Sequence, residues 1–256
     1  MRRLIASFAV ALVVSSSATA ADEKAEAIVK KGIEAHGGAD ALNKYKAGRF
    51  KMKGEVSILG MDIEFTGKLS YMMPDRYQME MQAEFMGQKM VIKQTVKGET
   101  VKATIMFGGM NLPAGGDSEK EELKLASIMQ EAERLTPLLD SKKFTVKTAA
   151  EEEVDGKKVD VLVIMPTAVK KEVRFYFDKK SGLLVKTAHK GKGPGEDGTP
   201  VEVNEESFHS DFKKINGVET AQKMEVKHDG KKFMTVKASD IELLEKIDDK
   251  EFTVDD

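Results

Sequence analysis

Residues that could carry out chemistry are few and scattered in this 256-residue chain, which has no cysteine and four histidines. The histidines are His36, His189, His209 and His228. No two of them have the spacing of a metal site on one element, although residues distant in sequence can still meet in space. The chain also lacks a G-x-S-x-G elbow, a P-loop and a dinucleotide fingerprint. The sequence therefore points to no catalytic residue, metal site or cofactor, and we expect no enzyme activity.

One pair of sulfur residues has a spacing that could bind metal. Met79 and Met81 would lie on the same face of a strand, and two thioethers are soft ligands that suit Cu(I). The alternating pattern around them explains both equally well as interior packing residues. No histidine or methionine cluster completes a copper site, so we favour packing.

The stretch from Phe50 to Phe107 consists of alternating runs that hold more than half of the 15 methionines. In 61–71 and 76–85 apolar and polar residues alternate, which predicts neighbouring antiparallel strands with one apolar face. Methionine suits a surface that repacks around varied apolar guests; an ordinary core that uses methionine is the alternative. The predicted interior residues of this wall are Phe50, Met52, Val56, Ile63, Phe65, Leu69, Tyr71, Met79, Met81, Phe85, Met90, Ile92 and Phe107.

The first twenty residues have the pattern of a secretory signal peptide. Arg2 and Arg3 precede a short apolar run, and Ala18-Thr19-Ala20 is a small-residue cleavage site. We expect cleavage near Ala20 and a periplasmic protein of residues 21–256, without the cysteine that carries the lipid of a bacterial lipoprotein. The formal net charge of −2 becomes more negative when the arginines are removed, which excludes nucleic-acid binding driven by bulk charge.

Helical periodicity is expected over 22–35, 39–45 and 118–139, and strand patterns fill most of the remainder. His36-Gly37-Gly38 should end the first helix, and Pro137 should kink or end the third. Asp-Gly and Asn-Gly pairs predict tight hairpins in the second half, and 190–200 reads as a polar surface loop. The pattern predicts a single domain, mainly β with helices (α+β), of about twelve strands.

The helix predicted over 118–139 has an apolar stripe that must cover an apolar surface. Glycines in 107–116 could provide a hinge on its entry side. We therefore predict a movable lid over the sheet, with an immobile core helix as the alternative. The lid residues are Leu125, Ile128, Met129, Ala132 and Leu135.

The order of these elements resembles the LolA/LolB-like superfamily of periplasmic lipoprotein carriers and outer-membrane lipoprotein-sorting proteins. The similar segments are the helix ending at His36-Gly37-Gly38, the Y-M-M-P-D-R-Y step at 71–77, the central helix, the Y-F-D-K-K-S-G-L-L-V-K segment at 176–186 and the I-D-D-K-E-F end at 247–252. The resemblance implies a curved antiparallel sheet forming an incomplete barrel of about 11–12 strands, covered by N-terminal and central helices. Where the family has a lid-holding arginine directly before the proline, this sequence has Met73.

The resemblance also implies a function. The concave apolar face would hold the acyl chains of lipids or lipoproteins during outer-membrane lipoprotein sorting, with membrane-bound donor or acceptor proteins as partners. We expect a monomer. The alternative is a non-enzymatic envelope scaffold or interaction protein without a cavity.

Overall fold

The computed structural model describes residues 17–58, 60–112, 116–195 and 199–253. Most of the predicted signal peptide lies outside these residues. Helix α1 (Ser17–Ala35) begins inside that segment and continues through the predicted cleavage site at Ala20. Within the described part of the chain, no helix is both long enough and apolar enough to cross a membrane.

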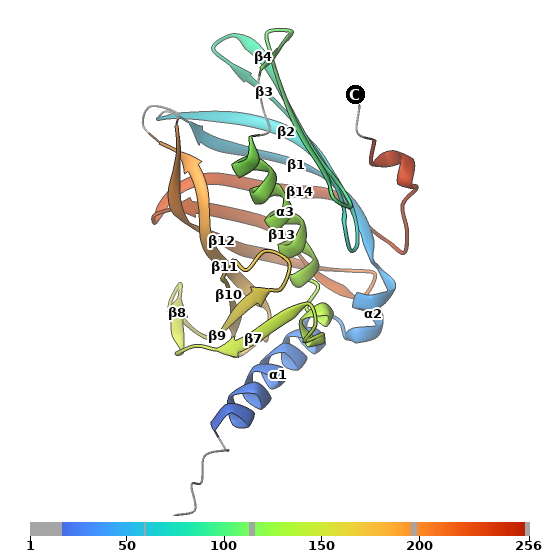
Figure 1. Cartoon of the computed structure of the whole chain (residues 1–256), viewed down its shortest axis with the longest axis vertical. Coiled ribbons are helices and arrows are strands. Elements are labelled where there is room, and N and C mark those ends of the chain that lie inside the picture. The colour runs from blue at the N-terminus through green and yellow to red at the C-terminus, as the bar shows by residue number, and fades with distance from the viewer. Residues whose placement is uncertain (1–16, 59, 113–115, 196–198, 254–256) are drawn as a thin grey trace, which may run out of the picture.

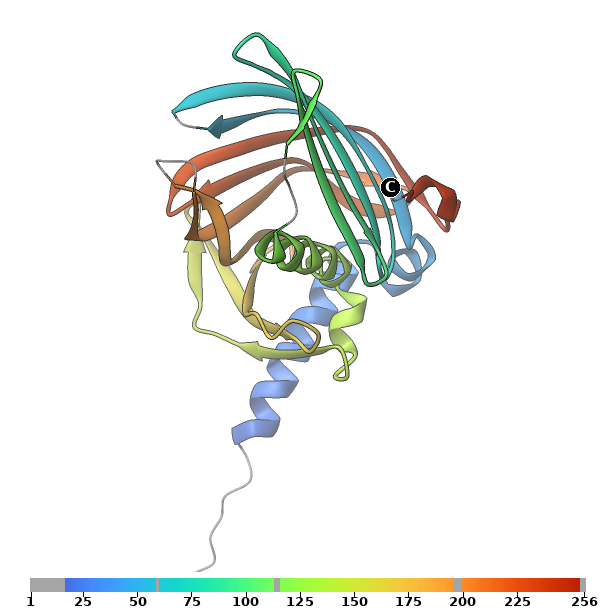
Figure 2. The ribbon, with the colours of Figure 1, turned by 45° about the horizontal axis from the view of Figure 1, so that its top comes forward.

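A 14-stranded sheet dominates the described residues, and its neighbouring strands are antiparallel (Figure 1). The first half contains β1 (Ala47–Ile58), β2 (Met61–Met72), β3 (Arg76–Phe85), β4 (Gln88–Lys97), β5 (Thr100–Phe107) and β6 (Met110–Leu112). The second half contains β7 (Phe144–Thr148), β8 (Glu152–Val154), β9 (Lys157–Pro166), β10 (Val173–Asp178), β11 (Leu184–Pro194), β12 (Pro200–Ile215), β13 (Val218–His228) and β14 (Lys231–Leu244). The strand order is β6-β5-β4-β3-β2-β1-β14-β13-β12-β11-β10-β9-β7, with β8 paired to β9. The sheet is open and curved, as the resemblance implied (Figure 2).

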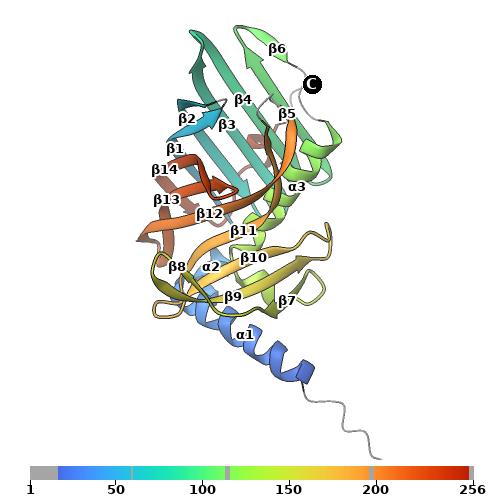
Figure 3. The ribbon, with the colours of Figure 1, turned by 90° about the vertical axis from the view of Figure 1, so that its left-hand side faces the viewer.

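The two halves of the sheet meet where β1 pairs with β14, from Ala47 opposite Leu244 to Val56 opposite Met234. Helix α3 (Asp117–Ala132) crosses the concave side between the two halves, and α1 lies against the far end of the second half (Figure 3). A short helix α2 (Ala39–Lys44) links α1 to β1. The predicted fold class, a curved antiparallel sheet with N-terminal and central helices, is confirmed.

Three hairpins in the second half form as their sequences predict. Both central residues of each turn have positive φ: 49° and 75° at Asp155-Gly156, 49° and 88° at Asn216-Gly217, and 48° and 78° at Asp229-Gly230. Those angles match the turn whose twist suits a two-residue hairpin. The predicted end of the first helix is also confirmed, because Gly37 and Gly38 have φ of 116° and 88° directly after α1.

Three details differ from the sequence prediction. The structure adds two three-residue strands, β6 and β8, which are too short to show a period. Part of the expected polar loop at 190–200 is strand, because β11 extends to Pro194 and β12 begins at Pro200; residues 196–198 lie outside the described residues. The central helix ends at Ala132, where Leu135 takes a positive φ of 63° before the 3₁₀ turn η1 (Thr136–Leu139).

The largest apolar core lies in the second half and not against the methionine-rich wall. Helix α1 contributes Val29 and Ile33, and β9 and β10 contribute Leu162 and Phe175, all of them buried. The predicted lid stripe of α3 joins this same core. Leu125, Ala132 and Leu135 are buried in it, and Ile128 and Met129 pack against it. The predicted stripe of α3 therefore packs in the core of the second half, while Leu123 of the same helix packs with Val96 and Ala103 of β4 and β5.

Candidate ligand cavity

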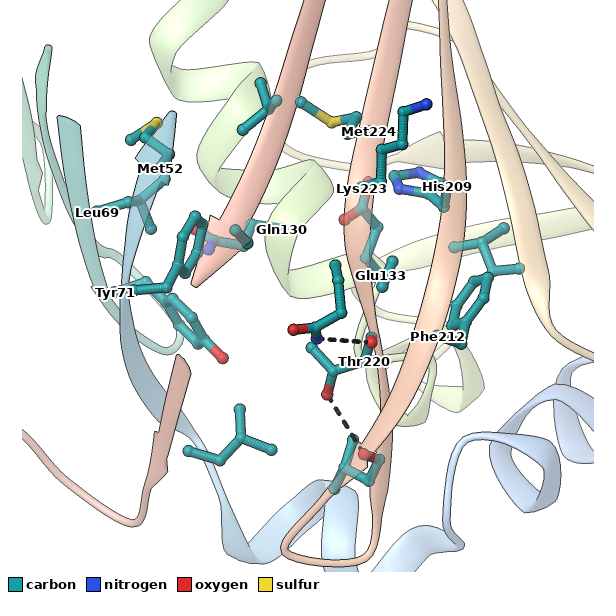
Figure 4. Close-up of a pocket in the computed structure, with 18 of the residues that line it drawn as sticks. Met52, Leu69, Tyr71, Gln130, Glu133, His209, Phe212, Thr220, Lys223 and Met224 are labelled. Carbon is teal, nitrogen blue, oxygen red and sulfur yellow. Dashed lines mark hydrogen bonds between the residues drawn. The ribbon is translucent and has the colours of Figure 1, made fainter. Parts of the chain in front are cut away.

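A cavity of about 400 Å³ lies on the concave side of the sheet (Figure 4). Strands β1, β2 and β3 form one wall, β12, β13 and β14 form the other, and the end of α3 borders it. Apolar side chains make up most of the lining. Its volume falls within the roughly 300–1,000 Å³ of small-molecule sites, near the lower limit.

Seven of the thirteen predicted interior residues line this cavity: Phe50, Met52, Phe65, Leu69, Tyr71, Met79 and Met81. Val56, Ile63 and Phe85 belong instead to the adjoining packed cluster of the first half. Met90, Ile92 and Phe107 share the same face by strand register, but further along the sheet. The alternation of apolar and polar residues predicted which face of these strands is apolar. The curvature of the sheet decides which residues of that face reach the cavity.

The opposite wall was not predicted, because it forms only where β14 pairs with β1. It includes Phe212, Val218, Met224, Met234, Val236 and Leu243. The alternation of β13 and β14 was legible in the sequence, but nothing local indicated which strand would lie beside β1. Only the long-range pairing of β1 with β14 could have identified this wall.

Met79 and Met81 both line the cavity, and no copper ligand set is evident around them. The Tyr77 hydroxyl donates to Met79 Sδ at 3.5 Å, and both methionines pack against the first-half cluster. Among the described residues, no group of three or more His, Cys, Asp or Glu side chains could hold a metal ion.

Gln130 on α3 and Glu133, the residue directly after this helix, both line the cavity. The Glu133 carboxyl makes no hydrogen bond or ion pair with another described residue. Burial among apolar groups raises its pKa to about 7. Near neutral pH this carboxyl is therefore protonated in a large fraction of molecules and can act as a hydrogen-bond donor.

His209 on β12 also lines the cavity, which brings one of the scattered histidines to the site. Burial lowers the pKa of its imidazole to about 4, so the ring is neutral at pH 7. Its Nε2 atom is buried and has no hydrogen-bond partner. His36 borders the same cavity, with its Nδ1 donating to the Gly32 carbonyl at 2.8 Å.

Arg134 follows α3 and connects it to α2. Its Nη2 donates to the carbonyl oxygens of Leu42 at 2.9 Å and Tyr45 at 2.6 Å. Its Nε is buried without an acceptor, and Arg134 lines the cavity. No sequence pattern singled out this arginine, because its partners are backbone carbonyls 89 and 92 positions away.

The Met73 position has no arginine, and Arg76 serves elsewhere. The Arg76 guanidinium donates to Asp249 at 2.7 Å and to Asp75 at 2.6 Å. Asp249 also pairs with Lys97 at 2.6 Å. These contacts fasten the C-terminal turn η2 (Asp249–Glu251) to strands β3 and β4. Beside the cavity, a different arginine bonds to a helix: Arg134 donates to the Leu42 carbonyl of α2.

The open, curved antiparallel sheet with a helix across its concave side is similar in fold to two solved structures. A solved structure of a LolA superfamily protein from Nitrosomonas europaea is 11% identical to this chain and covers 90% of it and 97% of its own length, with a TM-score of 0.50. A DUF1329 family protein from Desulfovibrio piger is 16% identical with the same coverage and a TM-score of 0.52. At these identities the likeness concerns the fold alone.

A putative outer membrane lipoprotein-sorting protein domain from Vibrio parahaemolyticus also matches, at 12% identity and a TM-score of 0.49, over 90% of this chain and 97% of that domain. No protein-family model and no curated protein matched the sequence. The resemblance predicted from the sequence is thus confirmed as a similarity of fold.

Proposed function

We propose that the mature protein is a carrier that binds the acyl chains of lipids or lipoproteins in its concave cavity. The observation that carries this proposal is the cavity of about 400 Å³, lined on two walls by apolar side chains. Burying an acyl chain is worth about 0.8 kcal/mol for each methylene, so a lipid crossing an aqueous compartment needs such a cavity. Methionines on both walls can adjust to guests of different shape.

The setting we propose is the periplasm, after cleavage near Ala20, with a role in outer-membrane lipoprotein sorting. The similarity of fold to a LolA superfamily protein supports this setting. In this role the chain is a monomer that meets membrane-bound donor and acceptor proteins, and it binds its cargo without catalysis. N-terminal sequencing of protein from the periplasmic fraction tests the cleavage site, and a chain that still begins at Met1 would contradict it.

Helix α3 is the proposed lid in this scheme. Its apolar stripe packs in the core shared with α1, while Gln130 and Glu133 face the cavity. Opening would expose that stripe, so a guest must compensate for the lost contacts.

The direct test is native mass spectrometry of protein purified from its own periplasm, which should show bound lipid. Delipidated protein should then take up a fluorescent fatty acid. Met81→Glu introduces charge into the cavity wall and should abolish uptake while the fold is retained. Met106, which is 39% exposed on the same half of the sheet, provides the control Met106→Glu. Absence of both bound lipid and uptake would refute the carrier proposal.

The second candidate is an envelope scaffold or interaction protein. The exposed methionines favour it, since Met86 and Met110 are 77% and 65% exposed and β6 is a fully exposed edge strand. A scaffold with no ligand predicts that Met81→Glu unfolds the protein as a buried charge would. Circular dichroism of that variant separates the two candidates.

A further inference from the structure

The cavity contains polar atoms that the protein leaves unsatisfied. Arg134 Nε and His209 Nε2 are buried without a hydrogen-bond partner. The Glu133 carboxyl and the Tyr71 hydroxyl line the same cavity. Buried polar groups without partners are costly, and native proteins rarely retain them without a reason. Here both unpartnered atoms belong to residues that line one cavity, which points to a ligand that carries polar atoms of its own.

The cavity is lined by charged residues of both signs, and Glu133 is protonated in a large fraction of molecules near neutral pH. Glu219 is paired with Lys214 at 3.6 Å. Arg134 and Lys223 have no carboxylate partner among the described residues, and the hydrogen bonds of Arg134 go to neutral carbonyls. A guanidinium that lines an apolar cavity and lacks an anion is a favourable site for one, because charge-assisted hydrogen bonds strengthen when water is excluded.

Tyr71 and Arg134 both line the cavity. The positive charge of Arg134 acts on the Tyr71 hydroxyl to lower its pKa, against the larger effect of burial, which raises it. The Tyr71 ring lies over Gly48, where an added Cβ would be 2.6 Å from the hydroxyl oxygen, and its hydroxyl points into the cavity (Figure 4). One anionic group could accept hydrogen bonds from both residues.

The size of the cavity limits the rest of the ligand. If a methylene occupies about the volume of a water molecule, roughly 30 Å³, then about 400 Å³ holds roughly a dozen methylenes. That volume suits one acyl chain and not several.

We propose that the cavity binds a single-chain amphiphile with an anionic head group, which accepts hydrogen bonds from Arg134 and Tyr71 while its chain lies along the methionine wall. This inference rests on the proposed carrier function and narrows its ligand class. A fatty acid and a lysophospholipid share the required chemistry.

The test is displacement of the neutral dye Nile red by dodecyl compounds that differ only in the head group, each below its critical micelle concentration. Dodecanesulfonate should compete at a concentration about tenfold lower than dodecanol, because one or two charge-assisted hydrogen bonds correspond to that factor. Dodecyltrimethylammonium should compete no better than the alcohol. Dodecanoate and dodecanoyl lysophosphatidylglycerol then identify which natural head group is preferred.

Two variants locate the head group. Tyr71→Phe removes only a hydroxyl, and Arg134→Met removes the charge; each should reduce the preference for the sulfonate over dodecanol. Tyr77→Phe is the matched control, because the Tyr77 hydroxyl already has Met79 Sδ as its acceptor. Arg134→Met also removes the contacts to α2, so Tyr71→Phe decides the outcome if that variant fails to fold.

Equal or tighter binding of dodecanol by the wild type would overturn the anionic head group and leave the carrier proposal intact. A sulfonate preference that survives Tyr71→Phe and a folded Arg134→Met would also overturn the assigned site. If neither Nile red nor any dodecyl compound binds, the carrier function itself fails and this inference fails with it.

Discussion

Gly54 on β1 lies against the carbonyl oxygen of Thr235 on β14 so closely that no side chain fits between them. The contact falls within the pairing that joins the two halves of the sheet. Phe65 closes the space from the other side, with its Cζ 2.9 Å from the position a Cβ would take.

Gly54→Ala should therefore destabilise the protein, because the backbone of Thr235 cannot move away without breaking the pairing. Overpacking costs roughly 1–3 kcal/mol in protein cores, and we expect the upper part of that range from urea denaturation. Gly116→Ala is the control, since a Cβ at Gly116 meets no atom within 4 Å. Equal stability of the two variants would contradict this prediction.

Glu133→Gln should stabilise the protein above pH 7. The pKa of Glu133 is about 7 in the folded protein, against an ordinary value of 4.5, so the folded state retains a proton that the unfolded state releases. The stability from this group is complete below pH 4.5 and is lost as the pH rises through 7. The loss reaches at most about 3 kcal/mol, and less where water enters the cavity.

The measurement is urea denaturation of wild type and Glu133→Gln at pH 5 and pH 8. The free energy of unfolding of the variant, relative to that of the wild type, should be higher at pH 8 than at pH 5. Glu121→Gln, an exposed position on the same helix, should show no such difference. A Glu133→Gln variant whose relative stability is the same at both pH values would show that Glu133 titrates normally.

Phe252→Ala should cost about 3–5 kcal/mol, the usual range for removing a buried aromatic ring. Phe252 has 0% exposure and packs with Ala47 and Ile247 beside the start of β1. Leu112→Ala, at a position 42% exposed, should be nearly neutral. Thermal denaturation compares the two, and a mild effect of Phe252→Ala would mean that the C-terminal turn is dispensable.

The lid proposal for α3 predicts that its outer contacts control ligand entry. Lys171 Nζ pairs with Glu122 Oε1 of α3 at 2.6 Å, and both side chains are partly buried. Lys171→Glu should speed the uptake of a fluorescent fatty acid and the hydrogen exchange of α3 amides, because like charges then repel. Adding Glu122→Lys restores the attraction and should reverse both effects.

Lys170→Glu makes the same charge change at the neighbouring exposed residue and should alter neither rate. Faster exchange of α3 amides without faster uptake would show that the helix can loosen without admitting ligand. In that case α3 would be part of the core and not a lid, the alternative that its packing with α1 also favours.

The sequence made the fold class and the strand faces predictable because alternation is a local property. The wall at Met79 and Met81 was identified in this way. The polar groups of the cavity were not, since Glu133, Arg134 and His209 look like ordinary residues of a charged helix and a strand. Their positions depend on the end of α3 at Ala132 and on the pairing of β1 with β14, neither of which a single segment specifies.

The pairing of Ala47 with Leu244 also has a consequence for the order in which the sheet can form. Because the chain is synthesised from its N-terminus, β1 exists before β14, and its edge has no partner until β14 has been made. Contacts between such distant segments form slowly. The cavity, whose walls meet at this seam, can therefore form only after β14 has been synthesised.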